Sequence, residues 1–148
     1  MKTISSLTFV MIAVLVMVWP AQARNDMYML PINAAQESTE AGQRPDGSVQ
    51  FFFGTSAAPK VVTSFASVTP HGKASTRGRD DIKACNAAFQ AALLEFQKRA
   101  KKVSANAVVN IVSYYKKVEV ASATEFECHA GAAAHVILRG ELAKIAEP

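Results

Sequence analysis

Two cysteines and three histidines are the side chains of this sequence best suited to covalent or metal chemistry. Cys85 falls on the apolar stripe of a predicted long helix, and Cys128 shares the apolar face of a predicted strand. Both side chains are therefore expected at one helix-on-sheet interface, where a disulfide is the default in an exported protein. The alternative is a metal-binding or thiol-redox site of Cys85, Cys128 and His129, but neither a CxxC motif nor a histidine pair accompanies it.

The histidines are His71, His129 and His135, and no Ser, Asp or Glu lies at a motif spacing from them that would mark a catalytic triad. Gly72-Lys73 resembles the end of a phosphate-binding loop, but the GxxxxGK[ST] pattern fails at its first glycine and at its hydroxyl residue. We therefore expect a protein that is not an enzyme, does not hydrolyse nucleotides and needs no cofactor.

Basic and aromatic side chains supply the remaining binding candidates. An anion would be held in the segment 69–79 by His71, Lys73, Arg77 and Arg79. Tyr114 and Tyr115 are expected at a hairpin tip, where strand alternation exposes only one of the two rings. A second basic cluster, at residues 98–102, is interpreted as the solvated end of the long helix.

Residues 1–23 have the pattern of a cleaved secretory signal peptide. Lys2 precedes an apolar run from Leu7 to Trp19, which is shorter than the roughly 20 residues of a membrane-spanning helix. Ala21-Gln22-Ala23 places small residues at the cleavage site, and no cysteine follows the run to accept a lipid. The alternative is a retained N-terminal anchor. We expect a soluble periplasmic protein that begins at Arg24.

Length and charge restrict the class of protein further. The chain has 148 residues, of which 16 are Lys or Arg and 12 are Asp or Glu, for a net charge of +4. That charge is too low for a dedicated nucleic-acid binder, so no nucleic-acid partner is expected. Residues 24–148 are long enough for one domain and too short for two.

The predicted elements describe an α+β domain. Strands are predicted at 26–32, 49–53, 60–68, 106–115, 118–128 and 134–145, helices at 33–41 and 82–103, and a loop at 69–79. The long helix shows apolar residues at three- and four-residue steps and begins after a capping Asp80 or Asp81. The order β-α-β-β-α-β-β-β favours a mainly antiparallel sheet with one long amphipathic helix packed on it.

Several stretches carry a resemblance to known families, namely Ala84-Cys85, 105–111 (ANAVVNI), 113–117 (SYYKK) and 123–131 (ATEFECHAG). They resemble small secreted proteobacterial proteins of unknown function that often carry the name "excinuclease ATPase subunit". The DNA-repair role in that name disagrees with the predicted signal peptide and with the absent phosphate-loop pattern.

The helix followed by Ala-Asn-Ala-Val-Val and two strands is more distantly similar to YbjQ-type domains, sometimes labelled heavy-metal-binding, and to RcsF-type domains. The first resemblance implies symmetric homo-oligomers. The second implies signalling by protein contact in a disulfide-held domain. This chain has two cysteines where that family has four and lacks its lipid-bearing cysteine, so membrane anchoring and the signalling role are not carried over. We expect a noncatalytic periplasmic protein that acts through protein or small-ligand contacts in envelope homeostasis.

Overall fold

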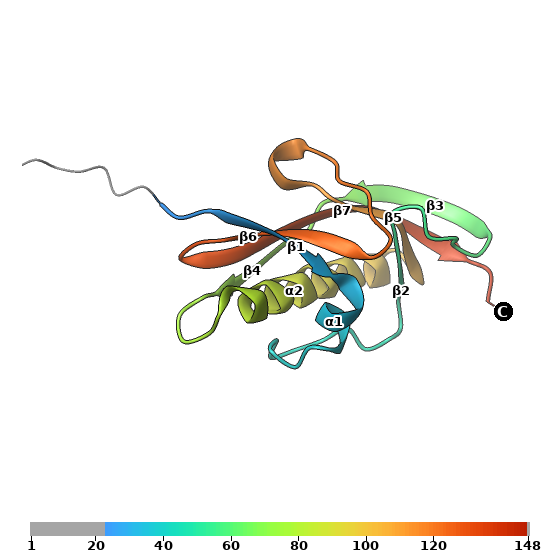
Figure 1. Cartoon of the computed structure of the whole chain (residues 1–148). Helices are drawn as coiled ribbons and strands as arrows, with labels where there is room; N and C mark the ends of the chain where they lie inside the picture. Colours follow the sequence, from blue (N-terminus) through green and yellow to red (C-terminus); the bar gives the residue numbers. More distant parts are fainter. Residues whose placement is uncertain (1–22, 148) are drawn as a thin grey trace, which may run out of the picture.

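The computed structural model describes residues 23–147, so the predicted signal peptide lies outside the described residues except for Ala23. Its elements are β1 (Asp26–Pro31), α1 (Ile32–Glu37), β2 (Gln50–Phe53), β3 (Val61–Val68), β4 (His71–Ser75), α2 (Asp81–Lys102), β5 (Ala107–Ser113), a 3-10 turn (Tyr115–Lys117), β6 (Glu125–Ala130) and β7 (Ala133–Ile145). The long helix α2 packs on one face of a curled, mixed sheet (Figure 1). The predicted α+β class is confirmed.

The long strand β7 organises the seven-stranded sheet. Its first half pairs with β6 and β4, and its second half pairs with β5 and β3. β1 extends the sheet antiparallel to β6, whereas β2 pairs parallel with β5. Alternate side chains of β7, among them Val136, Leu138 and Leu142, are buried against α2 and the core, as expected for a strand with one covered face.

Helix α2 forms as the apolar periodicity predicts. Asp80 is the N-cap, and its carboxylate accepts a hydrogen bond of 2.8 Å from the backbone N–H of Lys83. The core below the helix is aromatic, with the rings of Phe89 and Phe126 stacked at 4.3 Å between centroids. Within residues 23–147, no helix is both long enough and apolar enough to cross a membrane.

The predicted loop at 69–79 is wrong over its first half, because residues 71–75 form β4 and pair with β7. The segment looked like a loop because its inward positions hold only Gly72 and Ala74. The absence of a side chain is required at Gly72, because a Cβ atom there would lie 1.8 Å from the carbonyl oxygen of Ala88 in α2. The observed order therefore contains one more strand than predicted, between β3 and α2.

The predicted strand 118–128 is also wrong in its first half. Residues 118–124 form a connection that pairs with the sheet backbone at one isolated bridge, between Ser113 and Val120, and the side chain of Val118 is 62% exposed. The strand begins only at Glu125 and continues to Ala130. Valine and polar residues alternate at 118–121 as in a strand, but the segment pairs with β5 only at Val120, which the local pattern could not reveal.

The first helix is shorter than predicted, covering Ile32–Glu37 instead of 33–41. Pro31 occupies the N-cap position without a side-chain hydrogen bond. Asn33, the first residue of the predicted helix, lies inside the first turn, where its side-chain oxygen accepts a hydrogen bond from the N–H of Ala34.

Candidate functional site

The disulfide predicted between Cys85 and Cys128 is present. It joins the second turn of α2 to the middle of β6, with 5.9 Å between the two Cα atoms. Both residues are fully buried, and no cysteine in the described part of the chain is free. Because a bridged sulfur is not a thiolate, the bridged form offers neither the metal ligands nor the accessible redox thiols of the alternative site.

His129 does not join the two cysteines. Strand alternation in β6 points Cys128 toward α2 and His129 to the opposite side, which we call the outer face of the sheet. The set Cys85, Cys128 and His129 is therefore divided between the two faces, as the alternation predicts.

All three histidines of the chain lie on this outer face, from three neighbouring strands. His135 of β7 is paired directly with His129 of β6 on one side and with Lys73 of β4 on the other. His71 lies diagonally across from His135, and its Nε2 atom is 2.9 Å from Nδ1 of His135. Partial burial, followed by the charges of the neighbouring His71, Lys73 and His129, lowers the pKa of His135, so this imidazole stays neutral to a lower pH than usual.

His129 is held by a second set of contacts. Its Nε2 lies 2.5 Å from a carboxylate oxygen of Glu127, and the ring of Tyr115 stacks on the imidazole at 3.5 Å between centroids. Because a carboxylate only accepts hydrogen bonds, Nε2 carries the proton. The other ring nitrogen, Nδ1, is buried and has no hydrogen-bond partner.

The four basic candidates do not form one cluster. His71 is engaged with His135, whereas Lys73 and Arg79 line a shallow hollow beside α2 together with Glu40. The guanidinium of Arg79 donates to the backbone oxygen of Glu40 at 3.3 Å, and Arg77 is exposed in the turn after β4. The structure thus brings Lys73 and Arg79 to one hollow, while His71 and Arg77 are not among its lining residues.

The two tyrosines are both half-buried, so the expectation that one ring is core and the other exposed is wrong. Tyr114 lies under the guanidinium of Arg139, 5.1 Å from the ring centre, and Tyr115 covers His129. The residues after Tyr114 form a 3-10 turn instead of a two-residue hairpin, which changes the direction of both rings.

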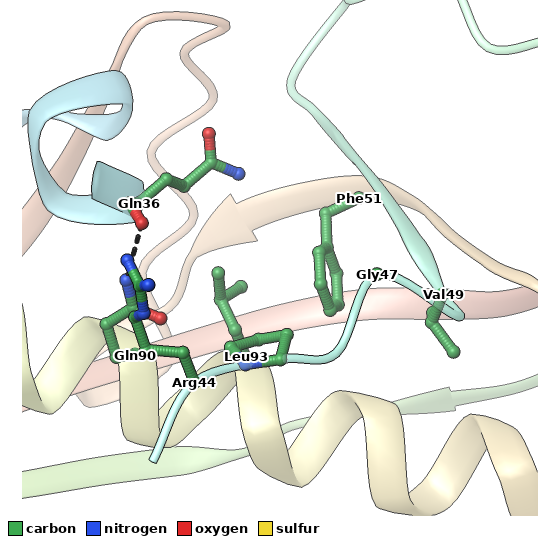
Figure 2. A pocket seen from close by; sticks show the side chains of 8 residues that line it. Gln36, Arg44, Gly47, Val49, Phe51, Gln90 and Leu93 are labelled. Atoms are coloured by element: carbon green, nitrogen blue, oxygen red, sulfur yellow. Dashed lines mark hydrogen bonds between the residues drawn. The ribbon is translucent and has the colours of Figure 1, made fainter. Parts of the chain in front are cut away.

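A pocket of about 270 Å³ lies between α1, the segment 42–49, β2 and α2 (Figure 2). It is lined by Gln36, Arg44, Val49, Phe51, Gln90 and Leu93, and also by Pro45 and Gly47 of the segment 42–49. The ring of Phe51 points toward α2 and lies 6.4 Å from the ring of Phe96. Apolar side chains therefore form much of the lining, and Arg44 supplies its one charged group.

Two buried glutamines on α2 hold the walls of this pocket. Gln90, only 1% exposed, donates from Nε2 to the backbone oxygens of Ala35 at 2.7 Å and Gln36 at 2.9 Å. Gln97 accepts a hydrogen bond of 2.9 Å from the backbone N–H of Asp46. This pocket was not predicted from the sequence. Two glutamines seven residues apart on an apolar helix face were a signal for it, because buried polar side chains need partners.

The start of the described chain is tied to the start of α2. The guanidinium of Arg24 forms an ion pair with Asp81 at 2.7 Å and contacts Asp26 at 2.9 Å and the carbonyl of Gly131 at 3.2 Å. The hydroxyl of Tyr28 also donates to Asp81, at 2.8 Å. Hydrogen bonds from Arg24 and Tyr28 lower the pKa of Asp81, and the same carboxylate raises the pKa of Tyr28.

In residues 23–147, no three His, Cys, Asp or Glu side chains lie close enough together to enclose a metal ion. Comparisons of the chain with protein-family models, with curated proteins and with solved structures find no match.

Proposed function

We propose that the chain is exported to the periplasm, loses residues 1–23, and acts there as a noncatalytic binding protein for a small ligand. A buried disulfide supports the compartment, since disulfides form and persist in oxidising environments. The route of export is supported by Lys2, by the short apolar run that follows it and by Ala21-Gln22-Ala23 at the cleavage site. A role in the cell envelope is what the resemblance to RcsF-type domains implies.

The observation that carries the binding proposal is the pocket held by Gln90. Phe51, Leu93 and Val49 offer apolar surface, and Arg44 offers a permanent positive charge at the same opening. Ligand sites usually combine an apolar lining with a few polar groups that fix the orientation. The ligand class that this lining fits is a small molecule with an apolar body and one anionic group.

The groups of this pocket favour recognition over reaction. The amide of Gln90 is committed to two backbone carbonyls, so it holds the wall in place. A guanidinium stays protonated at every physiological pH and is therefore a poor general acid or base. The lining can orient a bound anion through Arg44, which is the role that we assign to this residue.

Octanoate, which has an apolar chain and one carboxylate, is a suitable probe. We expect saturable shifts of the backbone amide signals of Gly47, Phe51 and Leu93 in NMR spectra of the ¹⁵N-labelled exported protein. Arg44→Gln should weaken binding about two- to fivefold, a loss typical of one exposed charge contact. Arg77→Gln, which removes an exposed charge far from the pocket lining, is the matched control and should leave the affinity unchanged. Shifts that do not saturate, or equal affinities of the two variants, would contradict the proposal.

A further inference from the structure

We propose that the free edge of β4 binds an extended, acidic segment of a partner protein as an added antiparallel strand. This edge is separate from the small-ligand pocket, and the two share no lining residue. Three features of the molecule support the proposal: backbone groups of β4 without a partner, a hollow beside them, and cationic side chains that line this hollow.

Strand β4 is paired along one side only. Within residues 23–147 its ladder is with β7 alone. The backbone N–H of Leu138 in β7 points toward β4 and donates to the oxygen of Pro70 at 3.2 Å. The oxygen of the preceding residue, Ile137, points the other way and accepts from the N–H of Tyr114 at 2.8 Å. Because this direction alternates along an antiparallel ladder, the even-numbered residues of β7 are those bonded to β4.

The register of the ladder identifies the backbone groups of β4 that remain unpaired. Gly72 and Ala74 lie opposite even-numbered residues of β7, so they hold the hydrogen bonds to that strand. The N–H and C=O groups of the alternate residues therefore point to the free edge, and these residues are His71, Lys73 and Ser75. No backbone hydrogen bond that the described chain forms outside its strands uses them. Such a row of donors and acceptors is a template for an incoming strand.

A hollow of about 450 Å³ lies beside this edge, and we call it the β4 hollow. Residues 73–75 line one side, the segment 40–43 lines another, and Ala87, Ala91 and Leu94 of α2 supply an apolar floor. A strand added to β4 would lie about 4.7 to 4.9 Å from it. Its alternate side chains would rest on this floor, and the others would project on the outer face beside Lys73. The β4 hollow therefore fits a segment with an apolar side chain at every second position.

The charges of the β4 hollow favour an acidic partner. Lys73 and Arg79 both line it, and within residues 23–147 neither forms an ion pair. The guanidinium of Arg79 donates to the backbone oxygen of Glu40 at 3.3 Å, which helps to hold it in place. The carboxylate of Glu40 opposes an anion, so two cations remain against one acidic group. Charge complementarity across an interface steers the choice of partner.

The test uses a peptide of about seven residues in which valine and glutamate alternate and both ends are blocked. Calorimetry on the exported protein should show saturable binding, and hydrogen exchange at the amides of Lys73 and Ser75 should slow. Lys73→Gln and Arg79→Gln should each weaken binding about two- to fivefold, and Glu40→Gln should tighten it by a similar factor. Lys144→Gln removes an exposed charge of β7 outside the β4 hollow, so this control should leave the affinity unchanged.

A second arm of the test separates strand pairing from simple charge attraction. In an antiparallel pair, residues that exchange hydrogen bonds project side chains on the same face, so the glutamates beside Lys73 must donate to β4. Methylation of the glutamate amides should abolish binding, whereas methylation of the valine amides should leave it within about threefold. Lys73→Pro should weaken binding at least about fivefold more than Lys73→Gln, because a carbonyl of the peptide loses its donor. Proline is tolerated where the N–H of an edge strand is free.

Circular dichroism verifies the fold of each variant, and the methylated peptides decide the outcome if Lys73→Pro does not fold. Absent binding, equal binding of the two methylated peptides, or equal binding of a peptide with lysine in place of glutamate overturns the proposal. Concentration-dependent shifts of the Lys73 amide signal in the protein alone would show that a second copy occupies the edge, which also overturns it.

Discussion

At the scale of single residues, the ion pair between Arg24 and Asp81 makes stability depend on pH. The folded-state pKa of Asp81 lies below its ordinary value, so the unfolded chain takes up a proton at this carboxyl first. The contribution to stability is therefore fully present above about pH 4 and is lost as the pH falls through the folded-state pKa.

Asp81→Asn should remove this contribution. We expect a lower melting temperature than wild type at pH 7, and a difference between the two proteins that shrinks as the pH falls toward 3. Glu37→Gln, an exposed position on α1, is the control and should leave the melting temperature unchanged at both pH values. Thermal unfolding followed by circular dichroism gives the comparison, and a constant difference between pH 7 and pH 3 would argue against the ion pair.

Gly72 is a second residue with a testable role. Gly72→Ala would place a methyl carbon 1.8 Å from the carbonyl oxygen of Ala88, so β4 and α2 must separate. Overpacking of this kind costs about 1 to 3 kcal/mol. Gly42→Ala has no heavy atom within 4 Å of the new carbon and should stay within about 0.5 kcal/mol of wild type. Urea unfolding measures both, and equal stabilities would mean that the helix does not lie this close to the strand.

At the scale of elements, the disulfide determines how firmly α2 is joined to the sheet. It closes a segment with a sequence separation of 43 residues, and loss of such a bridge from a small exported domain costs about 2 to 5 kcal/mol. Cys85→Ser should show this loss in urea unfolding, and one free thiol should become titratable in the unfolded variant. The unreduced wild-type protein should show none, and two titratable thiols in it would exclude the bridge.

The helix α2 and the strands β4 and β6 show which parts of the fold could be predicted from the sequence. The positions of Cys85 and Cys128 followed from local periodicity, because a helix and a strand each determine which side chains point inward. Strand β4 could not be found in this way, since Gly72 and Ala74 carry no hydrophobic pattern and the strand depends on pairing with β7. The contact between His71 and His135 was missed for the same reason, as it spans 64 residues and exists only once that ladder forms.

At the scale of the whole molecule, the two faces of the sheet carry different kinds of side chain. The inner face of the sheet holds the disulfide, the aromatic core and α2, while the outer face carries all three histidines. The pocket lies beside the middle of α2, where Gln90 joins the helix to α1 and Gln97 joins it to the segment 42–49. The proposed ligand pocket therefore does not require the core to open.

The central claim is that this domain works outside the cytoplasm with α2 covalently joined to β6. Intact-mass spectrometry of the protein extracted from the periplasm under non-reducing conditions tests it most directly. The predicted result is a chain running from Arg24 to Pro148 that gains two hydrogen atoms on reduction. A chain that retains Met1, or one whose mass does not change on reduction, would contradict the claim.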